Sequence, residues 1–392
     1  MQDTQHHNTS HRHPLVWVSA AETSADMHGA ELIASLERQA PQVAVRGMGG
    51  PAMRRQAFTA DFRSEQLSVM GLTEVIEFLP RILRLLRQTR QRLADLRPDV
   101  VVVIDSPDYH FRIARAAHKL GIPVVYYIAP QAWAWRKGRV RFLRRFVDKL
   151  LCILPFEQEW FREHGVDTEF VGHPFMDQID FRELRTLNVS KQRIALLPGS
   201  RMKEVKVLLP RFAEAARLLL ARHPDLRFVL VQAPSIEKTD IRALWPADLP
   251  LTIIEAAERY REIRRSRVAL AASGTATLEC ALLGTPTVVS YAVSSLSYLV
   301  GRLLIKVPFI AMPNLILGER VFPEYIQHQA TGPALAGQVS SWLQNPEELD
   351  TIHTKLETLP ERLGLGGASD NAARAVLQQI LPKTGQSKGH QS

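Results

Sequence analysis

The chain has 392 residues, of which 46% are hydrophobic and 23% are charged, so length and composition predict a soluble globular protein of two domains. Its two cysteines, Cys152 and Cys280, lie in apolar runs, which excludes a disulfide framework and favours a reducing cytoplasm; no apolar stretch reaches the roughly 18 residues of a membrane-spanning helix. The net charge of +9 favours an anionic membrane surface or phosphorylated small molecules over nucleic acid, because the basic residues are not interleaved with aromatic ones as in nucleic-acid-binding modules.

The first part of the chain predicts one α/β domain. Residues 1–14 are polar and His-rich, and we expect a disordered extension without a secretory signal. Over residues 15–180, short apolar runs alternate with amphipathic stretches. Within residues 99–108, positions 100–104 are an unbroken run of Val and Ile, which is typical of a strand buried on both faces. This alternation predicts a mostly parallel sheet covered by helices on both faces.

The same pattern restarts after a boundary near residues 177–192 and predicts a second domain over 190–345. Helices over residues 346–381 are expected to pack back towards the first domain, and residues 382–392 to form a disordered tail. The predicted fold class is therefore α/β, with two doubly wound Rossmann-like domains facing an interdomain cleft. Ligands of such sheets bind at the carboxyl ends of the strands, so the cleft is the expected site.

In the first domain, Asp105 ends the Val-rich strand and Asp108 follows it. A carboxylate at a strand end can act as general base for an alcohol, and burial would raise its pKa towards the working range. The alternative is that one of the pair caps the next helix, a role that suits Asp108 better. The sequence therefore favours Asp105 as the chemical group.

The loop after the next strand carries Trp133, Trp135 and Arg136, which are suited to line a pocket for the sugar and phosphate of an amphiphile. Aromatic packing beside a solvated basic helix is the equal alternative. His173 is either a cleft residue or a hydrogen-bonded structural histidine. The sequence contains no cluster with metal-ligand spacing, so no metal and no cofactor are predicted.

A basic amphipathic stretch runs from Val69 to Leu93, with leucines on one side and arginines on the other. Such helices lie on anionic membranes, although a domain helix with one face in the core is the alternative. The segment from Ser294 to Ile310 is a second apolar and basic candidate.

Two loops of the second domain predict an anion site. Gly199, Ser200 and Arg201 follow one strand, and Arg201 can contact a phosphate through two N–H groups. Ser273, Gly274 and Thr275 lie where another strand gives way to a helix, and its free N–H groups attract an anion. Glu279, one turn further, suits a sugar diol. Together the loops indicate a bound diphosphate, with an ordinary capped helix and a solvated arginine as alternatives. Walker and Rossmann glycine motifs are absent, which disfavours a dinucleotide.

Several motifs in this order, including "IDSPDYHFRIA", "APQAWAWRKGRV", "VGHPF", "LLPGSR", "SGTATLE" and "PNLILG", resemble the bacterial lipid A disaccharide synthase family, inverting glycosyltransferases of the GT-B fold. The resemblance spans about Leu15 to Ile380. It implies transfer of 2,3-diacylglucosamine from its UDP donor to the 6-hydroxyl of 2,3-diacylglucosamine 1-phosphate, giving a β-1,6-linked disaccharide phosphate and UDP. It also implies a homodimer at the inner face of the inner membrane.

By position, the resemblance implies that Asp105 is the essential carboxylate and Arg201 the diphosphate-side arginine. It assigns Ser273, Thr275 and Glu279 to the nucleotide-binding turn and Asn314 to a segment near the nucleotide.

The first loop of the family is expected to contact the acceptor. Here it keeps Glu22, Ser24 and Asp26, but Ala21 and Ala25 replace the usual glycines. If those glycines supply room or positive φ, alanine there has a cost, which makes acceptor use less secure than donor binding. Two rival functions therefore stay open: a UDP-sugar 2-epimerase, and a non-catalytic paralogue that binds a sugar nucleotide.

Overall fold

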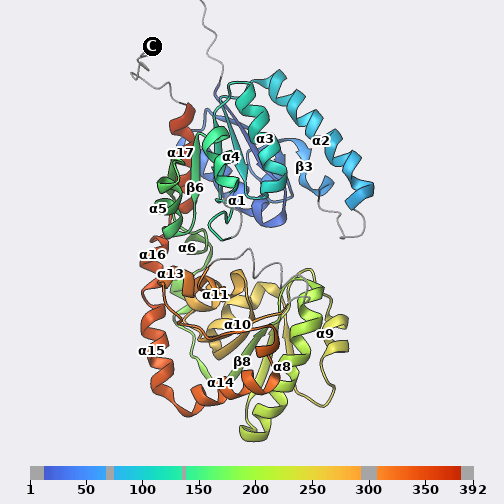
Figure 1. Cartoon of the computed structure of the whole chain (residues 1–392), viewed down its shortest axis with the longest axis vertical. Coiled ribbons are helices and arrows are strands. Elements are labelled where there is room, and N and C mark those ends of the chain that lie inside the picture. Colours follow the sequence, from blue (N-terminus) through green and yellow to red (C-terminus); the bar gives the residue numbers. More distant parts are fainter. Residues whose placement is uncertain (1–12, 68–74, 135–137, 293–306, 381–392) are drawn as a thin grey trace, which may run out of the picture. The chain divides into compact units, whose positions relative to one another are not determined.

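The computed structural model describes residues 13–67, 75–134, 138–292 and 307–380, with only the backbone for residues 75–79. The chain divides into two compact units, each considered by itself below (Figure 1). The first unit contains the residues up to Pro174 and those from Gly366 onward, and the second runs from Phe175 to Leu365.

The first unit is built on a seven-stranded parallel sheet with strand order β3-β2-β1-β4-β5-β6-β7. The strands and helices alternate along the chain, as the sequence predicts. They are β1 (Leu15–Ala20), α1 (Thr23–Gln39), β2 (Ala44–Gly49), β3 (Thr59–Arg63), α2 (Val75–Leu96), β4 (Val100–Ile104), α3 (Pro107–Lys119), β5 (Val124–Tyr127), α4 (Gly138–Phe146), β6 (Lys149–Cys152), α5 (Pro155–Glu163), β7 (Thr168–Phe170) and, from the C-terminal end, α17 (Ala368–Ile380).

Alternation of side chains along the strands divides the core of this unit into two layers. In β4, Val101 and Val103 belong to the layer covered by α2 to α5, whereas Val100, Val102 and Ile104 belong to the layer covered by α1 and α17. All five β4 side chains are fully buried. The continuous apolar run of β4 is therefore explained by helices on both faces of the sheet.

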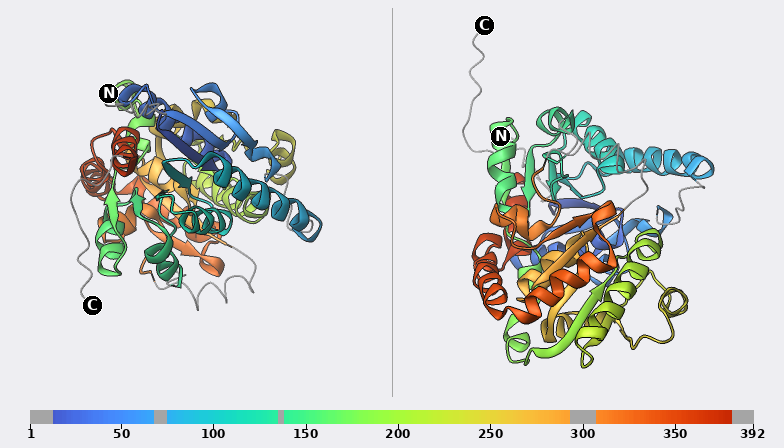
Figure 2. Two further views of the ribbon diagram at one scale, coloured as in Figure 1. Left: turned by 90° about the horizontal axis from the view of Figure 1, so that it is seen from above. Right: turned by 60° about the horizontal axis from the view of Figure 1, so that its bottom comes forward.

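The second unit repeats the design with a six-stranded parallel sheet of order β10-β9-β8-β11-β12-β13. Figure 2 gives two further views of both sheets and their helices. The elements of the second unit are α6 (Phe175–Gln178), α7 (Phe181–Leu184), β8 (Ser190–Leu197), α8 (Met202–Arg222), β9 (Arg227–Val231), α9 (Lys238–Leu244), β10 (Thr252–Ile254), α10 (Arg259–Arg265), β11 (Ser266–Ala272), α11 (Thr275–Leu282), β12 (Thr287–Tyr291), α13 (Met312–Leu317), β13 (Glu324–Ile326), α14 (Gly332–Gln344), α15 (Pro346–Leu356) and α16 (Leu359–Leu363).

The C-terminal helices are shared between the units. We expected all of residues 346–381 to pack towards the first domain, but α15 packs on α14 and α16 packs on α11 and α13, within the second unit. The buried side chains Leu349, Leu356 and Leu363 belong to these two helices. Only α17 joins the first unit, where Ala372 and Val376 enter the core beside α1.

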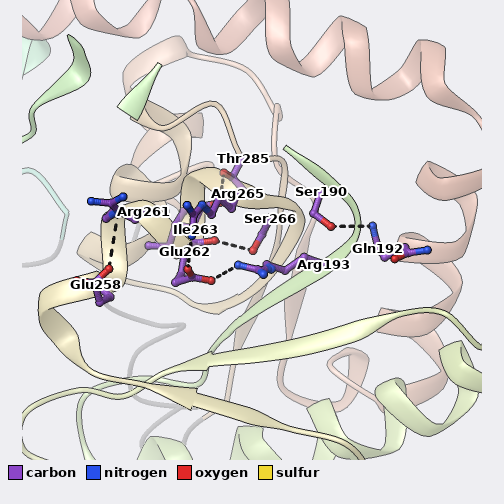
Figure 3. Close-up of polar contacts among 10 residues, drawn as sticks. All are labelled: Ser190, Gln192, Arg193, Glu258, Arg261, Glu262, Ile263, Arg265, Ser266 and Thr285. Atoms are coloured by element: carbon purple, nitrogen blue, oxygen red, sulfur yellow. Dashed lines mark hydrogen bonds and ion pairs between the residues drawn. The ribbon is translucent and has the colours of Figure 1, made fainter. Parts of the chain in front are cut away.

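Charged side chains at the amino ends of β8 and β11 tie α10 to the second sheet (Figure 3). Glu262 accepts from Arg193 of β8 and from Arg265, 3.3 Å away. Ser266 donates to the Glu262 carbonyl at 2.7 Å, and Thr285 donates to the Ile263 carbonyl at 2.8 Å. These groups pair with one another at the amino ends of the strands, whereas ligands of such sheets bind at the carboxyl ends, so their role is structural.

Within the ranges the structure describes, no helix is long and apolar enough to cross a membrane. Cys152 and Cys280 are free thiols, both buried.

Candidate functional site

The strand order of the first unit reverses between β1 and β4, where Ala20 lies opposite Ile104. Successive connections leave such neighbouring strands in opposite directions, which opens a crevice at their carboxyl ends. The turns that follow the two strands carry Glu22 and Asp105, and the Ser106 hydroxyl donates to Glu22 Oε1 at 3.1 Å. The structure thus brings together two carboxylates that lie far apart in the sequence.

Asp105 is half-buried, and burial raises the pKa of its carboxyl above the ordinary value. The Ser106 backbone opposes this shift, nearby Glu22 adds to it, and Arg139 opposes it. A raised pKa makes the ionised carboxylate a stronger proton acceptor. Asp108, which the sequence favoured as the cap of the next helix, instead lies in the first turn of α3, and Ser106 is the N-cap residue.

A cavity of about 270 Å³ adjoins these turns and lies wholly within the first unit. Both polar and apolar side chains line it; its lining residues are Ala21, Glu22, Leu67, Ile82, Ser106, Pro107, Asp108, Tyr109 and Arg112. This composition suits a ligand with a hydroxylated head and an apolar chain. Arg112 was not identified from the sequence, because nothing in its α3 pattern separates it from a solvated basic face.

Alanine in place of the family glycines has a limited structural consequence. Ala21 lines the cavity, and Ala25 is buried inside α1. Neither residue has positive φ, so the backbone at these positions does not require glycine.

Asp26 is buried and serves the backbone of a neighbouring turn. Its carboxylate accepts from the N–H groups of Gly50, Ala52 and Met53 at 2.6, 2.8 and 3.2 Å. A Cβ on Gly50 would lie 2.5 Å from Asp26 Oδ2, which explains glycine at that position. The predicted contact between Asp26 and the acceptor substrate is therefore harder to make than one from Glu22 or Ser24, both of which are exposed.

Replacing Asp26 by alanine is expected to lower the free energy of unfolding by about 3 kcal/mol, because it leaves buried N–H groups without acceptors. Urea unfolding followed by circular dichroism measures this change. Asp180→Ala is the matched control: Asp180 is an exposed helix cap that accepts one N–H, from Glu183 at 3.0 Å, and its loss should cost about 1 kcal/mol. Equal losses in the two variants would contradict a special role for Asp26.

Trp133 and His173 lie at separate places in the first unit. The half-buried Trp133 donates its indole N–H to Glu157 Oε1 at 2.9 Å and packs edge-on against Phe156. Burial raises the pKa of Glu157 to about 7. Burial also lowers the pKa of His173 to about 3, assisted by neighbouring His28, so His173 is neutral at physiological pH. Trp135 and Arg136 lie outside the described residues.

The second unit has its own reversal of strand order, between β8 and β11, where Leu197 lies opposite Ala271. The two predicted anion-binding loops follow these two strands, so they are neighbours at the carboxyl ends of adjacent strands. Gly199 has φ of +116°, and a Cβ there would lie 2.6 Å from Glu204 Oε2. Ser200 is exposed, and the Arg201 side chain is 80% exposed at the start of α8, 3.1 Å from Glu204. Arg201 is therefore accessible to an anion.

The turn at Ser273, Gly274 and Thr275 opens α11. Gly274 and Thr275 are exposed, so the N-terminal end of the helix is accessible. Ser273 instead donates its hydroxyl to the Ile310 carbonyl at 3.0 Å and so joins the turn to the segment that precedes α13. The Ser273 hydroxyl proton is therefore already used within the protein and is not available to an anion.

Glu279 is buried beside two residues that sequence reasoning missed. Its Oε1 lies 3.0 Å from Arg259 Nη2 and 3.4 Å from the Tyr260 hydroxyl, and Arg259 stacks over the Tyr260 ring. Burial raises the pKa of Glu279, whereas Arg259 and Tyr260 counteract the shift. No sequence spacing links these groups, because α10 and α11 meet only in the fold.

Asn314 is fully buried, and its side chain is saturated by its own loop. Oδ1 accepts from the N–H groups of Val321 and Phe322, while Nδ2 donates to the Phe322 carbonyl and to Glu324 Oε1, all within 2.9 Å. These contacts use the full hydrogen-bonding capacity of the amide. Asn314 therefore stabilises the loop beside the segment that accepts the Ser273 hydrogen bond. Its predicted contact with the nucleotide donor would have to be indirect.

In the part of the chain that the structure describes, no group of three or more His, Cys, Asp or Glu side chains is placed to hold a metal ion.

Comparison with known proteins assigns this arrangement to a family. A family model described as lipid-A-disaccharide synthetase matches residues 16–379. The lipid-A-disaccharide synthase of Myxococcus xanthus is 40% identical over 377 residues, covering 94% of this chain and 98% of the relative. That of Syntrophus aciditrophicus is 40% identical over 374 residues, covering 93% and 98%.

Solved structures share the fold at low sequence identity. UDP-GlcNAc 2-epimerase from Neisseria meningitidis, bound to UDP-GlcNAc, superposes with a TM-score of 0.62 at 14% identity and covers 93% of this chain and 99% of its own. The glycosyltransferase of kitacinnamycin gives a TM-score of 0.62 at 15% identity, covering 94% and 100%. Sugar-nucleotide epimerases and GT-B glycosyltransferases thus have this architecture in common.

Proposed function

The chain belongs to the lipid-A-disaccharide synthetase family and is a glycosyltransferase, and from this premise we propose that it transfers 2,3-diacylglucosamine from UDP to the 6-hydroxyl of 2,3-diacylglucosamine 1-phosphate. The products are a β-1,6-linked disaccharide 1-phosphate and UDP. The observation that best supports this proposal is that the expected groups flank the strand-order reversal in each unit: Glu22 and Asp105 in the first, and the loops starting at Gly199 and Ser273 in the second.

In the proposed reaction, Asp105 accepts the proton of the acceptor's 6-hydroxyl while that oxygen attacks the anomeric carbon of the donor sugar. The bond from this carbon to the diphosphate oxygen breaks on the opposite side, which inverts the configuration. Negative charge grows on the departing UDP, where Arg201 and the first N–H groups of α11 stabilise it. Glu279 accepts hydrogen bonds from the ribose hydroxyls. No step requires a metal or a cofactor.

The cavity beside Asp105 supports an acceptor with an acyl chain. Leu67, Ile82 and Tyr109 provide its apolar lining, and Ser106 and Glu22 provide polar groups near the reacting hydroxyl. In this proposal Ser24 contacts the acceptor directly, whereas Asp26, Trp133 and His173 shape the surrounding loops.

The test is turnover of the purified chain with the UDP donor and the phosphorylated acceptor, followed by mass spectrometry of the lipid product. We expect a tetraacyl disaccharide phosphate, formed in a one-to-one ratio with UDP. Conversion of the donor sugar to its 2-epimer without acceptor would instead identify an epimerase. Tight UDP binding without any turnover would identify a non-catalytic paralogue.

We also propose that the chain acts as a peripheral protein on an anionic membrane, at the inner face of the inner membrane, and as a homodimer. A groove of about 770 Å³ between α2 and α3 supports the membrane contact. It is lined by Leu83, Leu86, Arg87, Arg90, Gln91, Ala94, Arg112, Arg115, Ala116, Lys119 and Leu120, without any carboxylate. Leu83 is 54% exposed. Residues 69–74 of the predicted amphipathic stretch, and most of the second one, Ser294 to Ile310, lie outside the described residues.

Reversing two charges of this groove, in Arg87→Glu/Arg90→Glu, is expected to weaken binding to phosphatidylglycerol vesicles at least tenfold, since each basic residue near an anionic surface contributes about 1 kcal/mol. Vesicle flotation at low and high salt measures the effect. The double variant Arg217→Glu/Arg222→Glu, on the exposed side of α8, makes the same change in net charge and should bind as the wild type does. Equal weakening in both variants would assign membrane binding to net charge alone.

Analytical ultracentrifugation of the purified chain tests the proposed homodimer.

A further inference from the structure

The backbone around Asp105 adopts a conformation that non-glycine residues avoid. Asp105 and Ser106 have φ of +51° and +45°, and Ile128, at the end of the neighbouring strand β5, has φ of +66°. These are three of the five non-glycine residues with positive φ in the described chain. Such residues persist only where surrounding contacts hold them, and they concentrate at functional sites.

The contacts that hold this turn converge on the backbone carbonyl of Asp105. The Tyr126 hydroxyl donates to it at 2.7 Å, and His110 Nδ1 donates to it at 2.7 Å. The Asp105 N–H in turn donates to the Tyr127 carbonyl at 3.0 Å. Both lone pairs of the carbonyl are thus occupied, so the Asp105 peptide is fixed by β5 on one side and by α3 on the other.

His110 is oriented from its other nitrogen. A carbonyl can only accept, so Nδ1 carries the proton; burial lowers the pKa of His110 to about 4, so the ring is neutral and Nε2 is an acceptor. The Ser19 hydroxyl on β1 donates to Nε2 at 2.9 Å. Ser19, His110 and Tyr126 are all fully buried, and their polar atoms face protein groups.

We propose that Tyr126 and His110, the latter oriented by Ser19, are positioning residues for the transfer reaction: they hold the strained turn that carries the proton-accepting carboxylate of Asp105. The inference rests on the proposed role of Asp105. Neither residue touches the substrate; each acts by fixing where the carboxylate lies relative to the acceptor hydroxyl. Small displacements of a reacting group lower a rate by one or two orders of magnitude.

The first test is a pair of substitutions at each position. Tyr126→Phe removes one donor and is expected to lower kcat about tenfold or more, with the KM for the donor and the Kd for UDP unchanged. His110→Asn places an amide N–H near the position of Nδ1, so it should retain most of the activity that His110→Leu loses. Thermal unfolding confirms that each variant is folded. Tyr325→Phe and His223→Asn remove comparable bonds in the second unit, to Gln338 and Ser340, and should leave kcat unchanged.

The deciding test is a double-mutant cycle. If Tyr126 acts through Asp105, adding Tyr126→Phe to Asp105→Asn should lower single-turnover rates no further than Asp105→Asn does alone. A further tenfold drop in the double variant, or a Tyr126→Phe rate within twofold of wild type, would overturn the inference while leaving Asp105 as the base. Full activity of Asp105→Asn would instead remove the proposed base, and this inference with it.

Discussion

Asp105→Asn is expected to lower kcat for disaccharide formation about a thousandfold, with the Kd for UDP unchanged. Asparagine has nearly the same shape as aspartate but cannot accept the proton of the acceptor hydroxyl, and general-base catalysis contributes roughly 10²–10⁴ to a rate. The Kd should not change, because Asp105 lies in the first unit and the nucleotide loops lie in the second. Steady-state UDP release and calorimetric titration with UDP measure the two quantities.

Two further variants make this result specific. Asp167→Asn alters an exposed carboxylate of the first unit, which pairs with Lys149 at 3.0 Å, and should leave turnover unchanged. Asp108→Asn tests the neighbouring carboxylate, in the first turn of α3. A thousandfold loss in Asp108→Asn combined with near-normal turnover in Asp105→Asn would reverse the assignment.

The pH dependence of kcat also tests the assignment of Asp105 as the base. The base must be ionised, so the rate should fall as the pH drops through the pKa of Asp105. Burial raises that pKa, so the acid limb should lie above the ordinary range of an exposed aspartate.

Arg201→Gln is expected to lower kcat about a hundredfold, because removing one donor from a group that stabilises developing charge costs roughly 10²–10³ in rate. The Kd for the UDP-sugar donor should rise less, about tenfold, because charge on the diphosphate is greater in the transition state than in the bound donor. Rapid-quench and titration experiments separate the two effects. The side chain is 80% exposed, so the variant should fold normally.

Arg217→Gln is the matched control, since Arg217 is an exposed arginine of the same unit that pairs with Asp248. Arg201→Lys should recover part of the lost rate, because lysine keeps the charge but not the paired N–H groups. If Arg201→Gln changed the KM for the acceptor and left kcat intact, Arg201 would not contact the departing diphosphate.

The parts of the site that sequence predicted are those governed by strand ends. Asp105 and the loops beginning at Gly199 and Ser273 each follow a buried apolar strand. Parallel sheets bring the carboxyl ends of such strands to the same side, so local patterns were sufficient to predict where these turns lie. The two-unit α/β architecture followed from the same alternation of apolar runs with amphipathic helices.

The parts that sequence did not predict depend on contacts between distant segments. Asp26 and Asn314 look like ligand-binding polar residues in a motif, but their side chains are occupied by backbone groups of neighbouring loops. Conversely, Arg259 reaches Glu279 from α10, and Tyr126 reaches Asp105 from the adjacent strand. No periodicity or spacing encodes these pairs, since they arise from how helices and strands pack.

In the proposed reaction, the second unit binds the uridine diphosphate and the first unit supplies the proton acceptor. Amide hydrogen exchange of the intact chain, with and without UDP, tests it most directly. We predict slower exchange in the segments around residues 199–201 and 273–279, with no change around Glu22 and Asp105. Protection of the Asp105 turn without protection of the Ser273 turn would contradict the assignment of nucleotide binding to the second unit.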